Sequence, residues 1–289
     1  MAQGSSRSRG AAAVLFFSAT LWGLAWWPLQ NLAAAGLHGP ALSTLCYGAA
    51  GLAGLPLLWR ERRRWQQRRR LLLLIALFGG WGSASFVLAL TSGDVVREML
   101  LFYLAPAWSV LGGRFFLGEA VRPRRWLAVA CALLGAYLVI RAGGPVSTSA
   151  ITYADWLALS SGLTFAGNNL TTRAGADIPV TSKIVASMLA CALLSGVVLA
   201  LQGLSIPSVS GELVLGMLGF LLVWIVVGNA TTSYGVTHLE AGRAALIILA
   251  ELVAAVLSVS LINGRTPAAL ELAGGALILG AAALDGLES

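Results

Sequence analysis

Apolar residues run through this chain in long blocks separated by short polar stretches, a pattern that predicts membrane-spanning helices. A helix needs about 20 mostly apolar residues to cross the hydrocarbon core of a bilayer. Ten stretches meet that requirement: 11–35, 41–59, 71–91, 97–117, 124–141, 154–173, 180–201, 212–233, 243–262 and 267–285. These spans use most of the 289 residues, so we expect an all-α integral membrane protein without a separate soluble domain.

The composition agrees with this class and excludes an ordinary soluble enzyme. Charged residues make up 11% of the chain, against about 25% in a typical soluble domain, and the mean hydropathy is +0.82. The three cysteines, Cys46, Cys131 and Cys191, fall inside predicted spans without metal-ligand spacing. We therefore expect no metal and no cofactor.

Positively charged residues fall mainly on one side of the predicted membrane. With the N-terminus placed inside, that side carries 16 of the 19 lysine and arginine residues, and the other side carries Arg97, Arg141 and Arg265. This bias predicts that both termini are cytoplasmic. Arginine outnumbers lysine 18 to 1, which is typical of a GC-rich bacterial genome and favours the inner membrane of a bacterium.

The net charge of +7 and the stretch RERRRWQQRRR, residues 60–70, raise the alternative of a nucleic-acid site. This stretch is a short loop between two predicted spans, which argues against that alternative. We expect the lipid bilayer, with its anionic headgroups, to be the neighbour of the loop, and no nucleic acid to bind.

Two pairs of segments indicate that the chain is an internal duplication. SATLWGLAWWPLQ, residues 18–30, aligns with SGLTFAGNNLTTR, residues 161–173, at an offset of 143. FYLAPAWSVLGGRFFLGE, residues 102–119, aligns with the region 248–265 at an offset of 146. Five spans are an odd number, so the second half, 146–289, must enter the membrane opposite to the first, 1–145. The prediction is two inverted five-helix repeats around a central cavity.

Several short motifs resemble the EamA-type drug/metabolite transporter superfamily. They are WG at Trp22 and Gly23, YLAP from Tyr103 to Pro106, LGE from Leu117 to Glu119, LLGAYLVI at 133–140 and GGALILGA at 274–281. Within that superfamily the chain resembles the YddG-type exporters of aromatic amino acids. The second half departs from the pattern, with Leu252 after Glu251 and NGR at 263–265 in place of LGE.

The resemblance implies that spans 1–4 and 6–9 surround the cavity, with spans 5 and 10 outside them. Polar and aromatic residues gather in those inner spans at helical spacing. The candidate substrate-binding residues are Trp22, Trp26, Trp81, Ser85, Tyr103, Asn168, Asn169, Trp224, Asn229 and Glu251.

The tryptophans have an alternative interpretation, because indole rings also anchor helices at the membrane interface. We favour that interpretation for Trp59, Trp65, Trp126 and Trp156, which lie near span ends. Trp22, Trp81 and Trp224 lie nearer mid-span, where an interfacial belt does not explain them.

The polar groups in the membrane also have two interpretations. Asn168 and Asn169 either face the cavity or form an interhelical amide contact, worth about 0.6 kcal/mol on average. Glu251 lies near the middle of a span, where a carboxylate is a functional candidate by default. It meets a substrate ammonium, carries a coupling proton, or braces a helix end.

Two prolines are candidate hinges, because proline removes a backbone hydrogen bond and kinks a helix. Pro106 lies in span 4 and Pro28 in span 1. We expect both to kink their spans.

The rival functions fit less well. The two histidines, His38 and His238, fall in predicted loops, and there is no HExxH, GxSxG or CxxC motif, so we expect no enzyme. A channel would need a continuous polar stripe or ionic rings. The preferred function is a monomeric secondary transporter that exports amino acids, aromatic ones above all, or similar small amphipathic metabolites. The alternative is a multidrug exporter of organic cations.

Overall fold

The described residues form a bundle of helices without strands. The computed structural model describes residues 2–37, 39–92, 98, 101–120, 123–142, 151–206, 210–264 and 266–286. The helices are α1 Ala2–Gly23, α2 Trp26–Ala34, α3 Gly39–Arg60, α4 Arg62–Trp65, η1 Gln66–Arg68, α5 Arg69–Ser92, α7 Ala105–Leu117, α8 Pro123–Ala142, α9 Tyr153–Ala174, α10 Val180–Leu201, α11 Gly211–Phe220, η2 Leu221–Gly228, α12 Asn229–His238, α13 Ala241–Ile248, α14 Ala250–Asn263 and α15 Ala269–Gly286.

Seven helical stretches in the described residues are long and apolar enough to cross a membrane. They are Arg9–Pro28, Gly39–Arg60, Arg62–Ala89, Pro123–Ala142, Val180–Leu201, Gly211–His238 and Ala241–Ile262. The prediction of ten spans is thus met in seven places, and the all-helical membrane class is confirmed.

The other three predicted spans coincide with helices that fall short of this requirement. At 97–117 the structure has α7, with 13 residues. At 154–173 it has α9, whose 22 residues include the polar group around Asn168 and Asn169. At 267–285 it has α15, whose apolar part is Ala269–Ala281.

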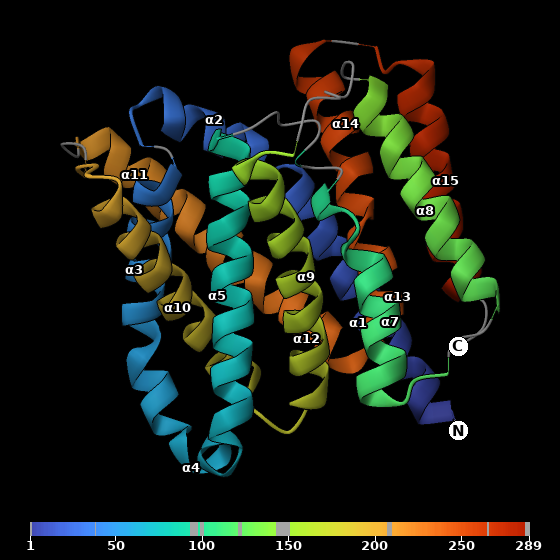
Figure 1. The fold of residues 1–289 in the computed structure, drawn as a ribbon, viewed down its shortest axis with the longest axis horizontal. Helices are drawn as coiled ribbons and strands as arrows, with labels where there is room; N and C mark the ends of the chain where they lie inside the picture. The colour runs from blue at the N-terminus through green and yellow to red at the C-terminus, as the bar shows by residue number, and fades with distance from the viewer. Residues whose placement is uncertain are drawn as a thin grey trace.

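Helices from the two halves of the chain pack against each other in pairs. Along the bundle, α8 lies against α15, α3 against α10, and α5 against α9 (Figure 1). The α8–α15 pair touches backbone to backbone: a Cβ on Gly135 would lie 2.6 Å from the carbonyl oxygen of Gly274. Small residues permit this approach, and the pair forms one edge of the bundle (Figure 1).

The inner helices complete the bundle around α1. That helix packs on α12 and α14, while α7 packs on α9 and α13. The beginning of α1 and the end of α15 lie towards the end of the bundle that carries α4 (Figure 1). The described parts of the first and last helices thus reach towards the same end of the bundle.

Candidate functional site

Tyr103 and Glu251 meet where two helical stretches are interrupted. The helical turn at Leu101 and Phe102 ends before α7 starts at Ala105, and Tyr103 lies in the interruption. Glu251 is the second residue of α14, directly after α13 ends. The Tyr103 hydroxyl donates a hydrogen bond of 2.6 Å to Glu251 Oε1. Two predicted site residues from opposite halves are therefore in direct contact.

A proline, Pro106, lies directly after the interruption and favours the start of a new helix there. Pro106 lies in the first turn of α7, where its missing N–H has no intrahelical partner to lose. The Leu104 carbonyl accepts from the backbone N–H groups of Ala107 at 3.0 Å and Trp108 at 3.3 Å. Span 4 is therefore interrupted at Pro106, where a helix begins anew, and the role of Pro106 as a hinge stays a prediction.

The other expected hinge has the same character. Span 1 is interrupted at Leu24 and Ala25, and Pro28 is the third residue of α2. Pro28 therefore lies in the first turn after a break and does not kink a continuous helix. The second half breaks between α13 and α14 without proline, at Leu249, so proline is not required for an interruption.

Trp22, Trp224 and Asn229 lie where α1 crosses the segment η2–α12. The Trp224 indole donates to the carbonyl of Leu21 at 2.8 Å, next to the break in span 1. Gly228 lies against Trp22, since a Cβ there would be 3.2 Å from the indole. The Asn229 amide donates to Ile225 O within its own segment at 2.8 Å. η2 is a π-helix, a rare form often found at functional sites.

Trp81, Ser85 and the two asparagines lie on α5 and α9. The Trp81 indole donates to Ser160 Oγ at 3.2 Å, and the Ser85 hydroxyl donates to the Trp81 carbonyl at 2.6 Å. Asn168 Oδ1 and Asn169 Nδ2 are buried and have no hydrogen-bond partner in the described part of the chain.

Two glycines connect these helix pairs to the Tyr103–Glu251 contact. A Cβ on Gly23 would lie 2.5 Å from the backbone oxygen of Glu251. A Cβ on Gly162 would lie 2.7 Å from the backbone oxygen of Phe102. The Tyr103–Glu251 hydrogen bond therefore joins the α1–α12 pair to the α5–α9 pair.

Several neighbours of this contact are absent from the sequence-based candidates. Ser258 accepts the Trp26 indole hydrogen bond at 2.9 Å. The Phe102 ring packs on Phe86 and Phe165, with ring centroids 4.5 and 5.5 Å apart. Phenylalanines in apolar spans give no periodic polar signal, which is why the sequence pattern misses them. A small apolar pocket beside them is lined by Phe102, Tyr103, Pro106, Phe165, Ile248 and Leu249.

One end of the bundle is held together by polar contacts around the corner between α12 and α13. The Glu119 carboxylate accepts from the backbone N–H of Ala241 at 3.2 Å. The Arg125 guanidinium pairs with Glu240 at 2.6 Å. Burial raises the pKa of the Glu119 carboxyl above its usual value, against the opposing effect of the Ala241 hydrogen bond.

A buried lysine at the same corner adds to these contacts. Lys183 is 1% exposed, and its Nζ donates to Thr237 Oγ1 at 2.7 Å and to the carbonyls of Thr172 and Gly175, both at 3.2 Å. The Arg173 guanidinium donates to the Thr237 carbonyl at 3.0 Å. Helices α9, α10 and α12 are thereby fixed together at this end.

Among the described residues, no group of three or more histidine, cysteine, aspartate or glutamate side chains is arranged to hold a metal ion. The candidate site offers hydrogen-bonding groups, the Glu251 carboxylate and aromatic surface.

The chain is similar to known proteins in sequence and in fold. Residues 9–141 match the EamA-like transporter family. A riboflavin transporter from Rhizobium johnstonii is 28% identical over 193 residues, which are 65% of this chain and 62% of that protein, less than two thirds of its length. A solved crystal structure of another protein has the same fold, with a TM-score of 0.79 and 20% identity over 96% of this chain and 97% of the other.

The family match covers the part of the chain with the WG, YLAP and LGE motifs. Together with the seven apolar helices, it indicates a multi-pass membrane protein. Residues 9–141 are thus similar to the EamA-like transporter family, and this similarity covers slightly less than half of the chain.

Proposed function

We propose that this protein is a secondary transporter that moves a small amphipathic metabolite across the membrane by alternating access. The observation that carries the proposal is the Tyr103–Glu251 hydrogen bond between two interrupted helical segments. In secondary transporters, substrate and coupling-ion sites are typically built from discontinuous helices near the midplane. Glu251 and Tyr103 are the groups that a substrate would meet there.

The proposal includes an inverted repeat of residues 1–145 and 146–289. Two left-handed glycines support it: Gly118 ends α7 with φ 66°, and Gly264 ends α14 with φ 64°. They lie 146 positions apart, the offset found in the sequence. The pairing of α3 with α10 and of α8 with α15 also fits a two-fold axis in the membrane plane, because each helix then lies beside its equivalent.

The proposed substrate carries an aromatic body and a polar head, and aromatic amino acids remain the preferred class. Three indole N–H groups, those of Trp26, Trp81 and Trp224, are used in contacts between helices. These rings can therefore offer only their faces. The unpartnered oxygen of Asn168 and amide nitrogen of Asn169 supply an acceptor and a donor, which suit an ammonium and a carboxylate.

Riboflavin is a second candidate, because the curated relative bears that name. Its flat ring system carries an imide, whose N–H and carbonyls can pair with one acceptor and one donor, so the two asparagines fit it as well. An exporter of organic cations is the third candidate. Such a substrate would depend on Glu251 and on aromatic faces, and less on the asparagines.

Orientation, localisation and assembly belong to the same proposal. The excess of arginine on the α4 side supports a cytoplasmic location for both termini, in a bacterial inner membrane. The monomer is proposed because each chain contains both halves of the repeat. The family match and the named relative suggest a function other than enzymatic catalysis.

Flux measurements in proteoliposomes test the proposal. Purified protein is reconstituted, and the transport of phenylalanine, riboflavin and tetraphenylphosphonium is measured with and without a pH gradient. We expect flux of at least one of these compounds to fall at least tenfold in Glu251→Gln and Tyr103→Phe. The matched control is Trp126→Phe, an exposed aromatic on α8 that is 42% accessible. Flux of all three compounds equal to that of empty vesicles overturns the proposal.

A further inference from the structure

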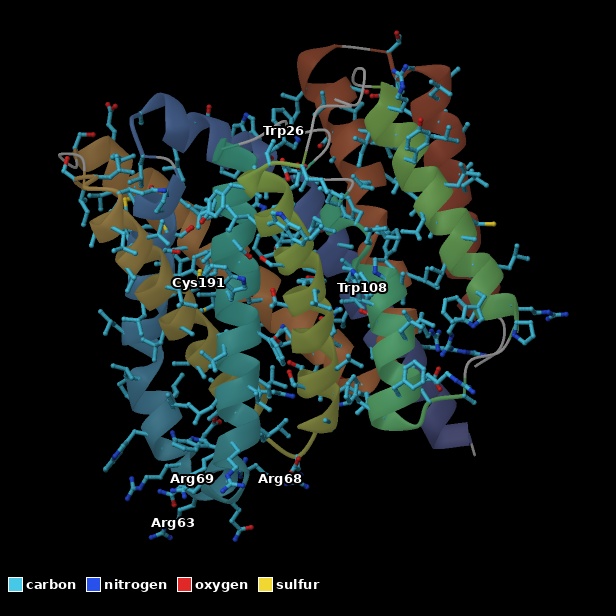
Figure 2. All side chains as sticks on the ribbon, in the orientation of Figure 1. Trp26, Arg63, Arg68, Arg69, Trp108 and Cys191 are labelled. Atoms are coloured by element: carbon cyan, nitrogen blue, oxygen red, sulfur yellow. The ribbon has the colours of Figure 1, made fainter. Side chains whose placement is uncertain are left out.

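The segment between α3 and α5 concentrates positive charge at one end of the bundle. Residues 60–70 contain seven arginines and one glutamate. The segment is folded into the short helices α4 and η1. Figure 2 shows Arg63, Arg68 and Arg69 gathered at this end of the bundle. We call residues 59–70 the arginine turn.

Three contacts fix the shape of the arginine turn. The Trp65 indole donates to the Leu58 carbonyl at 3.0 Å. The Ser182 hydroxyl donates to Glu61 Oε2 at 2.6 Å. Arg68 pairs with Asp177 at 3.2 Å. These contacts hold the turn in one shape, against α10 and against the connection between α9 and α10.

These contacts engage the acidic groups near the turn and leave arginines unpaired. Glu61 is bound by Ser182, and Asp177 is bound by Arg68. Arg63, Arg64, Arg69 and Arg70 are exposed, and none of these four has an ion-pair partner within the described ranges. Clustered guanidinium groups repel each other and attract anions.

The position of the turn between two membrane-spanning helices indicates which kind of anion it binds. The turn connects two helices, α3 and α5, that are long and apolar enough to span the membrane. Trp59, at the end of α3, is 68% exposed, and the Arg62 guanidinium lies 4.0 Å from the centre of its ring. An exposed indole at a helix end is typical of the membrane interface. An arginine turn placed between two such helices would lie at the depth of lipid headgroups.

We propose that the arginine turn is a binding site for anionic lipid headgroups, with the unpaired guanidinium groups on the lipid phosphates. A juxtamembrane cluster of four to eight basic residues is suited to this recognition. The proposal is independent of the transported substrate. If lipids were attracted only by the overall positive charge of that side, arginines elsewhere on it would contribute as much to lipid binding as those of the arginine turn.

Native mass spectrometry and thermal unfolding of the full chain in detergent test the proposal. The test variant is Arg63→Gln with Arg64→Gln. The matched control is Arg9→Gln with Arg114→Gln, which removes the same charge at exposed positions predicted on the same side. Each protein is titrated with phosphatidylglycerol, with phosphatidylcholine, with inorganic phosphate and with a short RNA.

We expect phosphatidylglycerol to bind and raise the Tm of the wild-type protein, and its apparent Kd to rise at least fivefold in the test variant. The control should stay within twofold of wild type. Equal loss in both variants, or no loss in either, overturns the proposal. So does a Tm increase from inorganic phosphate alone, or RNA that binds and competes with the lipid.

Discussion

The carboxylate of Glu119, just beyond α7, accepts a hydrogen bond from the backbone N–H of Ala241, the first residue of α13. This contact joins interrupted segments of the two halves at the end opposite to their breaks. An acidic group at a helix N-terminus is favourable, because the free N–H groups and the helix dipole attract negative charge. Opening this end of the bundle would require the contact to break.

Glu119 predicts a pH dependence of stability. Its pKa is raised by burial, so the folded protein binds the proton more tightly than the unfolded chain does. Protonated Glu119 therefore stabilises the folded protein below the ordinary carboxyl pKa. This contribution to the free energy of unfolding is lost as pH rises through the raised pKa of Glu119 in the folded protein. We expect the Tm of wild type minus that of Glu119→Gln to increase as pH falls from 7.5 to 5. Thermal unfolding in detergent measures this Tm difference. Glu212→Gln is the control, because it removes one exposed carboxylate. A Tm difference between wild type and Glu119→Gln that stays constant with pH contradicts the prediction.

The position of Pro106 at the start of α7 predicts that its replacement slows transport and leaves substrate affinity nearly unchanged. In Pro106→Ala the first turn of α7 regains an N–H, and the helix can continue through Tyr103, which would draw its hydroxyl away from Glu251. We expect turnover to fall several-fold, with affinity changed by less than threefold. Pro56→Ala is the control, because Pro56 lies within α3 at an exposed position. Unchanged turnover in proteoliposomes would show that the interruption does not depend on proline.

Gly23 and Gly162 predict that close backbone contact holds the site together. A Cβ at either position would lie less than 3 Å from a backbone oxygen of another segment, and overpacking of this kind costs about 1–3 kcal/mol. We expect Gly23→Ala and Gly162→Ala to lower the Tm by several degrees and to reduce transport. Gly219→Ala is the matched control, since no heavy atom lies within 4 Å of its added Cβ. Equal Tm values for all three variants would disprove the close approach.

The sequence predicts the membrane class well because hydropathy acts on each segment by itself. It predicts Tyr103, Glu251 and the two asparagines as site residues because polar groups are costly in a span and therefore conspicuous. The Tyr103–Glu251 contact joins positions 148 apart, and no local pattern specifies such a pairing. The break at Leu249 has no proline to mark it, and Phe102 is apolar among apolar residues. Both arise from tertiary packing, which periodicity does not encode.

Asn169 predicts opposite effects on stability and transport. Its side chain is 1% exposed and its Nδ2 has no hydrogen-bond partner in the described part of the chain. A buried group left unsatisfied costs about 1–3 kcal/mol, and a leucine of similar volume would remove that cost. If Asn169 serves the substrate, Asn169→Leu should raise the Tm by a few degrees while the apparent affinity for the transported compound falls at least fivefold. Asn168→Leu is a second test variant and not a control, because the proposed site uses Asn168 Oδ1 as well, and this oxygen lies over Gly79 at the contact of α5 with α9. A lower Tm with unchanged affinity in Asn169→Leu would assign this asparagine to packing between helices, and the substrate site would then have to be sought away from α9.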